Sequence, residues 1–462
     1  MIKKIFFTIL FATAVHVAPA QVWQHVGMQG FTPPVTQFSL TSLAIDHNGV
    51  LYVAYAAATD SDKISVMKFD GSSWIMVGSP GFSSGRGYDV SVTVDANNTP
   101  YVAYGDDGNA SHATVKKFDG SNWVDVGAPG FSDGVVNDCT IRFSSDDTAY
   151  VAYVDAFYSG KAVVKKFDGT NWVDVGTPGF TAGGTGQMSM ALSGSNLPYV
   201  AYQDQANGFA ESVMMFDGSD WVHVGAATFS NGSCQFSHIT FDNTGTIPYV
   251  CYNQGYNPFA PNVQVFDGSS WSYVGGQNLN TNVDYQNNFA LDGNNMPYVV
   301  FPDGAYNWRA SVMKFDGASW VYAGNTGFSS SGQIWFPNIL TDTLNNVYVE
   351  YYDETDSNKI SVLKLEIENS IADRKEEEMI SMFPNPANDK ISFSIPDESE
   401  VYELHIKNTI GQIVYTQPSK ENKIVADISS LVAGIYFYEI RSLKSTSPAL
   451  KNTTGKFLKI VK

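Results

Sequence analysis

The chain has 462 residues, of which 44% are hydrophobic and 14% aromatic, and its formal net charge is −19. This composition excludes a disordered chain, and the length predicts a large folded core together with a second, smaller unit. The acidic balance excludes nucleic acid as a partner, because nucleic-acid binding relies on clustered Lys and Arg side chains.

The first 20 residues are predicted to be a signal peptide. Lys3 and Lys4 precede an apolar run over residues 5–17, and residues 18–20, Ala-Pro-Ala, offer small side chains for cleavage. The apolar run is short for a membrane span, so we expect no transmembrane segment in a mature chain that begins at Gln21. The three cysteines are too few for a disulfide framework and indicate buried thiols.

Residues 21–365 contain an internal repeat with a period near 49 residues. The block F-D-G-x-x-W occurs six times, from Phe69 to Phe315, and the block Y-V-x-[YF] occurs seven times, from Tyr52 to Tyr348. This period suits four strands and four turns, and strand-forming residues alternate with turn residues such as Asp-Gly. The sequence therefore predicts an all-β fold, a seven-bladed β-propeller.

The last repeat lacks the tryptophan-bearing fourth strand, and the missing copy stands at the N-terminus. Residues 22–27 read VWQHVG, which matches W-x-x-V-G of the other repeats, and residues 30–32 match the Gly-Phe-Ser that follows them. A closed ring needs this displaced strand, whereas an open solenoid does not. We therefore expect the N-terminal strand to complete the last blade.

Beyond the repeats the chain changes character. Residues 366–380 are polar and acid-rich, which predicts a linker, and residues 381–462 carry short strand patterns that predict a small Ig-like β-sandwich.

Four motifs in this tail resemble the C-terminal sorting domain of the type IX secretion system of Bacteroidota. They are F-P-N-P-A-N-D-K at 383–390, N-T-I-G-Q-I-V at 408–414, D-I-S-S-L-V-A-G-I-Y at 427–436 and K-I-V-K at 459–462. The resemblance implies that residues 381–462 engage the type IX machinery. It also implies a secreted protein, on the outer-membrane surface or outside the cell, that is either anchored or released.

Aspartates recur two residues after the tyrosine or phenylalanine that ends the Y-V-x-[YF] block of the second strand. They are Asp106, Asp155, Asp204, Asp303 and Asp353. In a propeller these positions approach the channel mouth on one face, where five carboxylates would attract Ca²⁺. The alternative, which we favour, is that each aspartate begins its loop by accepting hydrogen bonds from backbone N–H groups. No other cofactor is indicated.

Seven of the nine tryptophans occupy the repeated fourth-strand position, whereas Trp308 and Trp335 do not. Both are expected in adjacent blades, on the face that carries the variable loops. We expect further residues of a ligand-binding cluster nearby, namely Tyr256, Tyr285, Tyr306 and Arg309. Such a cluster would stack on sugar rings or bury a peptide side chain; the alternative is that these aromatics pack the long loops.

The sequence contains no recognisable catalytic set. The function predicted is a secreted or surface-anchored binding module for a glycan or an extracellular protein. The alternative is an extracellular polysaccharide-degrading hydrolase or lyase that uses the recurring aspartates as acid and base, and a purely structural surface protein is a third possibility. His238 and Arg142, on predicted innermost strands, are interpreted as satisfied polar residues of the core.

Overall fold

The computed structural model describes residues 20–36, 40–255, 259–283, 286–330, 332–368, 381–384, 387–394, 402–408, 411–420, 423–442 and 452–460. The chain divides into two compact units, residues 1–368 and residues 369–462. The predicted signal peptide before Ala20, and residues 369–380 of the predicted linker, lie outside the described residues.

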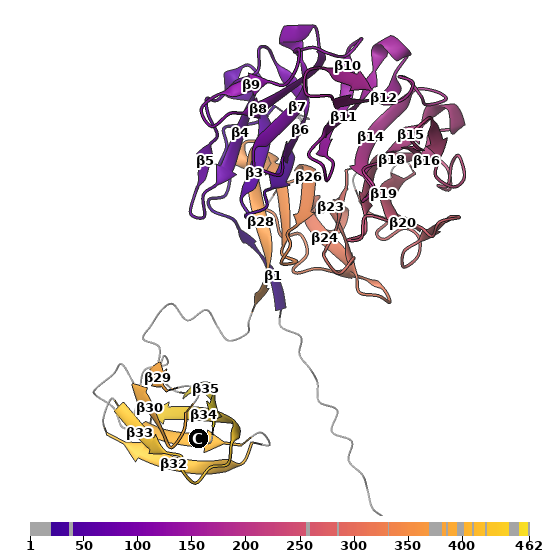
Figure 1. The fold of residues 1–462 in the computed structure, drawn as a ribbon. Coiled ribbons are helices and arrows are strands. Elements are labelled where there is room, and N and C mark those ends of the chain that lie inside the picture. Colours follow the sequence, from indigo (N-terminus) through magenta and orange to yellow (C-terminus); the bar gives the residue numbers. More distant parts are fainter. Residues whose placement is uncertain are drawn as a thin grey trace, which may run out of the picture. The chain divides into compact units, whose positions relative to one another are not determined.

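The first unit is a ring of seven four-stranded antiparallel sheets, the blades (Figure 1). Blades 1 to 3 contain β2 (Ser42–Ile45), β3 (Leu51–Ala57), β4 (Lys63–Phe69) and β5 (Trp74–Met76); β6 (Gly87–Val94), β7 (Pro100–Asp106), β8 (His112–Phe118) and β9 (Trp123–Asp125); and β10 (Val136–Phe143), β11 (Ala149–Asp155), β12 (Lys161–Phe167) and β13 (Trp172–Asp174).

Blades 4 to 6 contain β14 (Thr185–Leu192), β15 (Pro198–Asp204), β16 (Ala210–Phe216) and β17 (Trp221–His223); β18 (Cys234–Phe241), β19 (Pro248–Gln254), β20 (Ala260–Phe266) and β21 (Trp271–Tyr273); and β22 (Asn288–Leu291), β23 (Pro297–Asp303), β24 (Arg309–Phe315) and β25 (Trp320–Tyr322). Blade 7 contains β26 (Ile334–Thr341), β27 (Val347–Asp353), β28 (Lys359–Glu368) and the N-terminal strand β1 (Ala20–His25). The predicted seven-bladed propeller is confirmed.

Each blade is specified by short local signals. The second strand is buried on both sides; in β3, for example, every residue is buried. The third and fourth strands join through the Asp-Gly turn, in which the Asp70 carboxylate accepts hydrogen bonds from the backbone N–H groups of Ser72 and Ser73 at 2.8 and 2.7 Å. Gly71 supplies the positive φ, 100°, that the tight hairpin needs. The aspartates of the other F-D-G-x-x-W blocks accept the same hydrogen bonds, so the Asp-Gly turn is confirmed as a hairpin.

Neighbouring blades are joined by the repeated tryptophan. The Trp123 indole of blade 2 donates to the carbonyl of Val77 in the chain leaving blade 1, at 2.8 Å. Its ring stacks on Phe82, from the Gly-Phe-Ser block, with centroids 4.3 Å apart. The same pair recurs as Trp172 on Phe131 and Trp221 on Phe180. The phenylalanine therefore packs between blades and the block is architectural.

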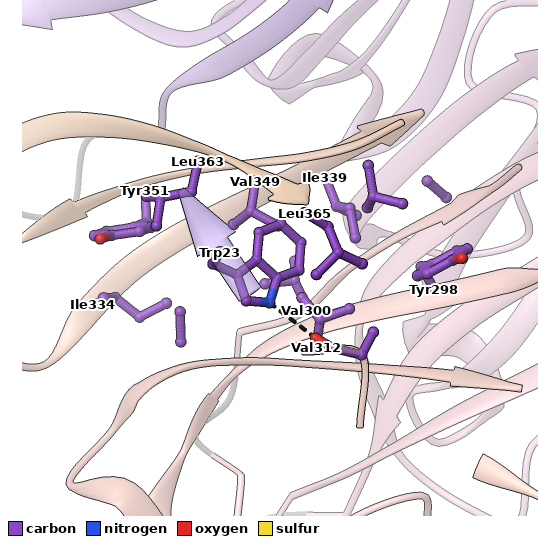
Figure 2. Packing of buried hydrophobic residues seen from close by; sticks show 14 residues of the cluster. Trp23, Tyr298, Val300, Val312, Ile334, Ile339, Val349, Tyr351, Leu363 and Leu365 are labelled. Carbon is purple, nitrogen blue, oxygen red and sulfur yellow. Dashed lines mark hydrogen bonds between the residues drawn. The ribbon is translucent and has the colours of Figure 1, made fainter. Parts of the chain in front are cut away.

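The ring is closed by its two ends. Strand β1 pairs antiparallel with β28, with Trp23 opposite Leu365, and the indigo N-terminal strand lies against the orange end of the propeller in Figure 1. Figure 2 shows Trp23 inside the cluster of blades 6 and 7, with its indole donating to the Ala323 carbonyl at 2.9 Å. The predicted closure of the last blade by residues 22–27 is confirmed.

The ring has two different faces. We call the side with the turns between first and second strands, such as residues 46–50, the hairpin face. The opposite side, with the connections between second and third strands, is the loop face. Six of these connections contain a short 3₁₀ turn: η1 (Ala58–Asp60), η2 (Asp107–Asn109), η3 (Ala156–Tyr158), η4 (Gln205–Asn207), η5 (Gly304–Tyr306) and η6 (Glu354–Asp356).

The second unit is a β-sandwich, as predicted. One sheet contains β29 (Ser381–Phe383), β30 (Lys390–Ser394) and β33 (Lys423–Asp427). The other contains β31 (Tyr402–Lys407), β32 (Ile413–Ser419), β34 (Gly434–Ser442) and β35 (Asn452–Lys459). Ile391, Leu404, Ile424 and Ile440 are among the residues buried between them. Within the described part of the chain, no helix has the length and apolar character needed to cross a membrane.

Candidate functional site

The innermost strands of the propeller enclose a central cavity of about 910 Å³. Its walls come from the innermost strands of all seven blades, β2, β6, β10, β14, β18, β22 and β26, and from the turns that follow several of them. Ser145, Asn243 and Thr244, which line it, are exposed turn residues. The cavity therefore opens on the hairpin face.

The mouth of the cavity is braced by hydrogen bonds between adjacent turns. The Ser145 backbone N–H donates to the Asn196 side-chain oxygen at 2.9 Å, and the Asn243 N–H donates to Asn295 in the same way at 2.7 Å. Blades 1 and 2 repeat the contact through His47. Bonds of this kind tie the turns of neighbouring blades together from blade 1 to blade 7, which restrains the opening.

One layer of the wall differs sharply between the two halves of the ring. The repeat places equivalent side chains there, namely Ser42, Ser91, Thr140, Ser189, His238, Asn288 and Asn338. The serine hydroxyls accept backbone hydrogen bonds from the next blade; that of Ser42, for example, accepts from the Val92 N–H at 3.0 Å. Blades 5 to 7 instead present an imidazole and two amides. The Asn338 amide donates to the Thr41 carbonyl at 3.1 Å and to Glu350, whereas the Asn288 amide uses one of its two N–H groups, on Asn338, and keeps the other for a ligand.

The amide wall is backed by a buried acid. Asn288 donates to the Asn338 side-chain oxygen at 3.1 Å, and Asn338 donates to the Glu350 carboxyl at 2.7 Å, as does Thr41 at 3.1 Å. Glu350 is fully buried, and burial raises its pKa to about 7 despite these two hydrogen bonds. It replaces the small residue of the Y-V-x-[YF] strand, for example Ala54, so the network is particular to blade 7.

Two phenylalanines line the cavity at strand irregularities. Phe236 and Phe336 have φ values of 55° and 42° at the bulges of β18 and β26. The Phe236 N–H donates to the Gln187 side-chain oxygen at 2.7 Å, and the Phe336 N–H donates to Gln286 at 2.5 Å. Asp89, Asp138 and Gln187 have the same positive φ at the equivalent bulges of blades 2, 3 and 4, so this backbone conformation belongs to the repeat and only the phenylalanine side chains are particular to blades 5 and 7.

The cavity also contains the two residues interpreted from sequence as satisfied core residues. His238 fits this interpretation in part: its Nε2 donates to the Asn287 carbonyl at 2.9 Å, and burial, with a contribution from the Arg142 charge, lowers its pKa to about 4. Arg142 donates through Nη1 to the Ile141 carbonyl at 2.8 Å. Both side chains line the cavity.

The five recurring aspartates serve as caps. Each precedes a 3₁₀ turn and accepts a hydrogen bond from the backbone N–H two residues later, that of Gly108, Phe157, Ala206, Ala305 or Thr355. All five are at most 1% exposed. Among the described residues, no three His, Cys, Asp or Glu side chains are grouped so that they could hold a metal ion. Each carboxylate is therefore engaged within its own part of the ring.

Replacing Asp106 with alanine is expected to destabilise the propeller by about 2 kcal/mol. The change removes the acceptor for Gly108 N–H at 3.0 Å, Asn109 Nδ2 at 2.7 Å and Ser84 Oγ at 2.6 Å. The neighbouring Asp107→Ala is the control, because Asp107 is exposed and its loss should cost less than about 0.5 kcal/mol. Urea unfolding measures both, and equal losses would contradict the capping role.

The loop-face cluster is only partly assembled. In blade 6, Trp308 is partly exposed, with its ring against Gly304, and Tyr306, 38% exposed, packs on Gly327. Arg309 lies beside them but donates through Nε and Nη2 to the Ser329 carbonyl, at 2.9 and 2.6 Å. Tyr322, which sequence reasoning missed, is 38% exposed and bonds Asp303. Tyr256 and Tyr285 lie outside the described residues.

Trp335 requires a correction. It was expected at the end of a connecting loop, in a patch able to contact ligand, but it lies within β26 and is 8% exposed. It packs with Val35 and Tyr352 between blades 7 and 1, and its indole donates to Glu354 at 2.9 Å. The physical reason is that β26, the first strand of blade 7, begins at Ile334, earlier than the repeat suggests. The indole of Trp335 is therefore covered by residues of blade 1.

Comparison with solved structures finds distant likenesses. An ulvan lyase bound to -[GlcA(1-4)Rha3S]- is 12% identical, with a TM-score of 0.48 over 74% of this chain and 95% of that one. PorZ of Porphyromonas gingivalis is 14% identical, with a TM-score of 0.46; the match covers 94% of this chain and 61% of PorZ. The Aleuria aurantia lectin is 15% identical, with a TM-score of 0.42; the match covers 65% of this chain and 99% of the lectin. These likenesses are too distant to transfer a ligand or an activity. No curated protein matches the chain.

The tail gives a specific match. Residues 381–449 match the family described as a secretion system C-terminal sorting domain. Described residues of three motifs take part in local contacts: the Gly411 N–H donates to the Asn408 carbonyl before β32, and the backbone carbonyl of Asp389 accepts from the Ile428 N–H at 2.8 Å. The second unit is therefore a type IX sorting domain, which marks the propeller that precedes it for secretion to the surface or exterior of the cell.

Proposed function

We propose that the exported propeller is a non-catalytic binding module that holds a polyhydroxylated ligand, such as the end of an extracellular glycan, in its central cavity. The observation that carries the proposal is the lining of this cavity. At about 910 Å³ it lies within the range of small-ligand sites, and polar side chains converge on it from several blades.

The lining has the chemistry that sugars require. Each sugar hydroxyl donates and accepts hydrogen bonds, and the amide of Asn288 can do both. The C–H faces of a sugar ring pack against aromatic rings, which Phe236 and Phe336 supply in the same cavity. The braced mouth on the hairpin face keeps these groups in place before a ligand arrives, which lowers the entropic cost of binding.

Binding is favoured over hydrolysis or elimination by the state of the five recurring aspartates and of Asp242. Glycoside hydrolysis needs two carboxyl groups about 5–10 Å apart with access to the substrate. The five recurring aspartates are buried in capping interactions. Asp242, the acid that lines the cavity, accepts from the Thr246 and Ile247 N–H groups of its own turn at 2.8 and 2.9 Å.

The loop face of blade 6 is a second candidate site, supported by Trp308, Tyr306 and Tyr322. Two of these side chains are 38% exposed, and they surround the end of β23. An aromatic surface of this kind would suit an extracellular protein or the outside of a longer glycan. It lies on the opposite side of the ring from the cavity mouth, so the two sites can be tested separately.

Replacing Asn288 with serine is expected to weaken glycan binding about ten-fold, because it removes amide hydrogen bonds from the cavity wall. The fold should tolerate the change, since blades 1, 2 and 4 carry serine at the equivalent position. The measurement is titration calorimetry of the mature chain, residues 21–462, against glycans selected on an array. Trp308→Ala is the matched control and should leave the affinity unchanged.

The opposite pattern would overturn the cavity assignment. If Trp308→Ala abolishes binding and Asn288→Ser does not, the site is on the loop face of blade 6. If no glycan binds the mature chain, or if bound glycans are shortened during incubation, the proposed non-catalytic glycan module is wrong.

A further inference from the structure

The central cavity contains one strongly basic side chain. Of its lining residues, Arg142 alone is a Lys or Arg. The repeat does not need a cation at this position, because the equivalent residues of the other blades are small or apolar. These residues are Ala44, Thr93, Ala191, Thr240, Ala290 and Leu340. Arg142 therefore departs from the architecture in the one place where all blades meet.

The guanidinium group has spare donors. It carries five N–H groups, and one of its nitrogens, Nη1, bonds the Ile141 carbonyl at 2.8 Å. None of the ion pairs among the described residues includes Arg142. Asp242, the acid that lines the same cavity, is occupied by its own turn, including a bond from Thr244 Oγ1 at 2.7 Å. The positive charge is therefore available to a ligand.

An unpaired charge in a confined cavity is costly, and proteins retain such groups mainly where a partner completes them. Burial lowers the pKa of Arg142, although a guanidinium stays charged at neutral pH. His238 does not add a second charge, because its pKa falls to about 4. The cavity thus presents one positive charge, and its one lining carboxylate, Asp242, is held by hydrogen bonds within its own turn.

We propose that the ligand of the central cavity carries one carboxylate or sulfate group, which Arg142 binds with its planar fork of N–H donors. This inference rests on the proposed function and names its ligand class: an acidic sugar, either a uronic acid or a sulfated sugar, whose hydroxyl groups contact the amides of Asn288 and Asn338. Arginine matches the geometry of both anionic groups, so the chemistry is shared and experiment distinguishes the two sources.

The test compares the mature chain with Arg142→Thr, a variant that copies blades 2 and 5 and is therefore expected to fold. Titration calorimetry is run with three oligosaccharides of equal length: neutral, uronic-acid-terminated and sulfated. The original protein should bind one acidic ligand at least about ten-fold tighter than the neutral one. Arg142→Thr should lose that preference and keep the neutral affinity, and Arg142→Lys should retain part of it, since it keeps the charge without the fork.

Failure of this inference is distinguishable from failure of the proposed function. If neutral and acidic glycans bind equally, or if Arg142→Thr keeps the preference, the anion site is wrong and the glycan module stands. If no oligosaccharide binds, thermal unfolding with sodium sulfate or sodium glucuronate decides. Stabilisation of the original protein but not of Arg142→Thr supports an anion site without a glycan function, and equal responses overturn both.

Discussion

Replacing Trp23 with alanine is expected to destabilise the propeller by about 3–5 kcal/mol. Trp23 is 7% exposed and stacks on Phe328 with ring centroids 4.5 Å apart. Its indole donates to the Ala323 carbonyl, and Leu365 packs beside it (Figure 2). The substitution removes these contacts from the strand that closes the ring, so it opens an edge as well as a cavity. Urea unfolding of the mature chain measures the loss.

The matched control for Trp23 is Trp172→Ala. Trp172 is similarly buried, at 8% exposure, stacks on Phe131 at 4.9 Å and donates to the Val126 carbonyl at 2.7 Å. Its strand, β13, follows β12 directly through a hairpin, whereas β1 reaches β28 from the far end of the unit. We expect only Trp23→Ala to raise amide hydrogen exchange along β1 and β28. Equal exchange in both variants would contradict the closing role of β1.

The propeller was predictable because each blade repeats the same local signals. Asp70-Gly71 fixes a hairpin, and the displaced VWQHVG segment shows where the ring closes. The 3₁₀ turns of the loop face were not anticipated, since a single turn has no periodic signature. In the sorting domain, β29 and β33 have three and five residues, which is too short for an alternating pattern to define their bounds.

The candidate site was harder to predict, because it depends on residues about 49 positions apart in the sequence. Aligning the repeats does contain the signal: Arg142 and His238 stand where other blades have Ala, Thr, Ser or Asn. That alignment shows that a residue departs from the repeat, but it does not show whether the side chain has hydrogen-bond partners within the protein. The burial of Trp335 illustrates the same limit, since exposure depends on which neighbouring blade covers a residue.

The propeller should become less stable as pH rises from about 4.5 to about 8, because of Glu211. This carboxyl group is fully buried; it accepts hydrogen bonds from Cys234 Sγ at 2.9 Å and Ser237 Oγ at 2.7 Å, but burial raises its pKa from 4.5 to about 8. Between these values the unfolded chain loses the proton and the folded chain keeps it. Each pH unit in that window then favours unfolding by about 1.4 kcal/mol, an upper limit for one group.

Glu350 acts in the same direction between pH 4.5 and about 7, for the same reason. Asp70 and Asp267 act oppositely at lower pH: turn hydrogen bonds lower their pKa from 3.8 to about 2, so the stability that they contribute is lost as pH falls below about 4. His238 opposes the two glutamates between pH 4 and 6.5, because burial lowers its pKa to about 4 and the unfolded imidazole is protonated first, whereas Asp138, whose pKa burial raises to about 7, acts with them.

Glu211→Gln isolates the main contribution. The amide is of nearly equal size, its oxygen can accept from Cys234 and Ser237, and it does not titrate. The variant should therefore match the original protein near pH 4.5 and exceed its stability at pH 8, as measured by urea unfolding at a series of pH values. Glu350→Gln should show a smaller gain over a narrower window. A pH profile that Glu211→Gln leaves unchanged would mean that this acid is already ionised in the folded chain, with a partner that offsets its burial.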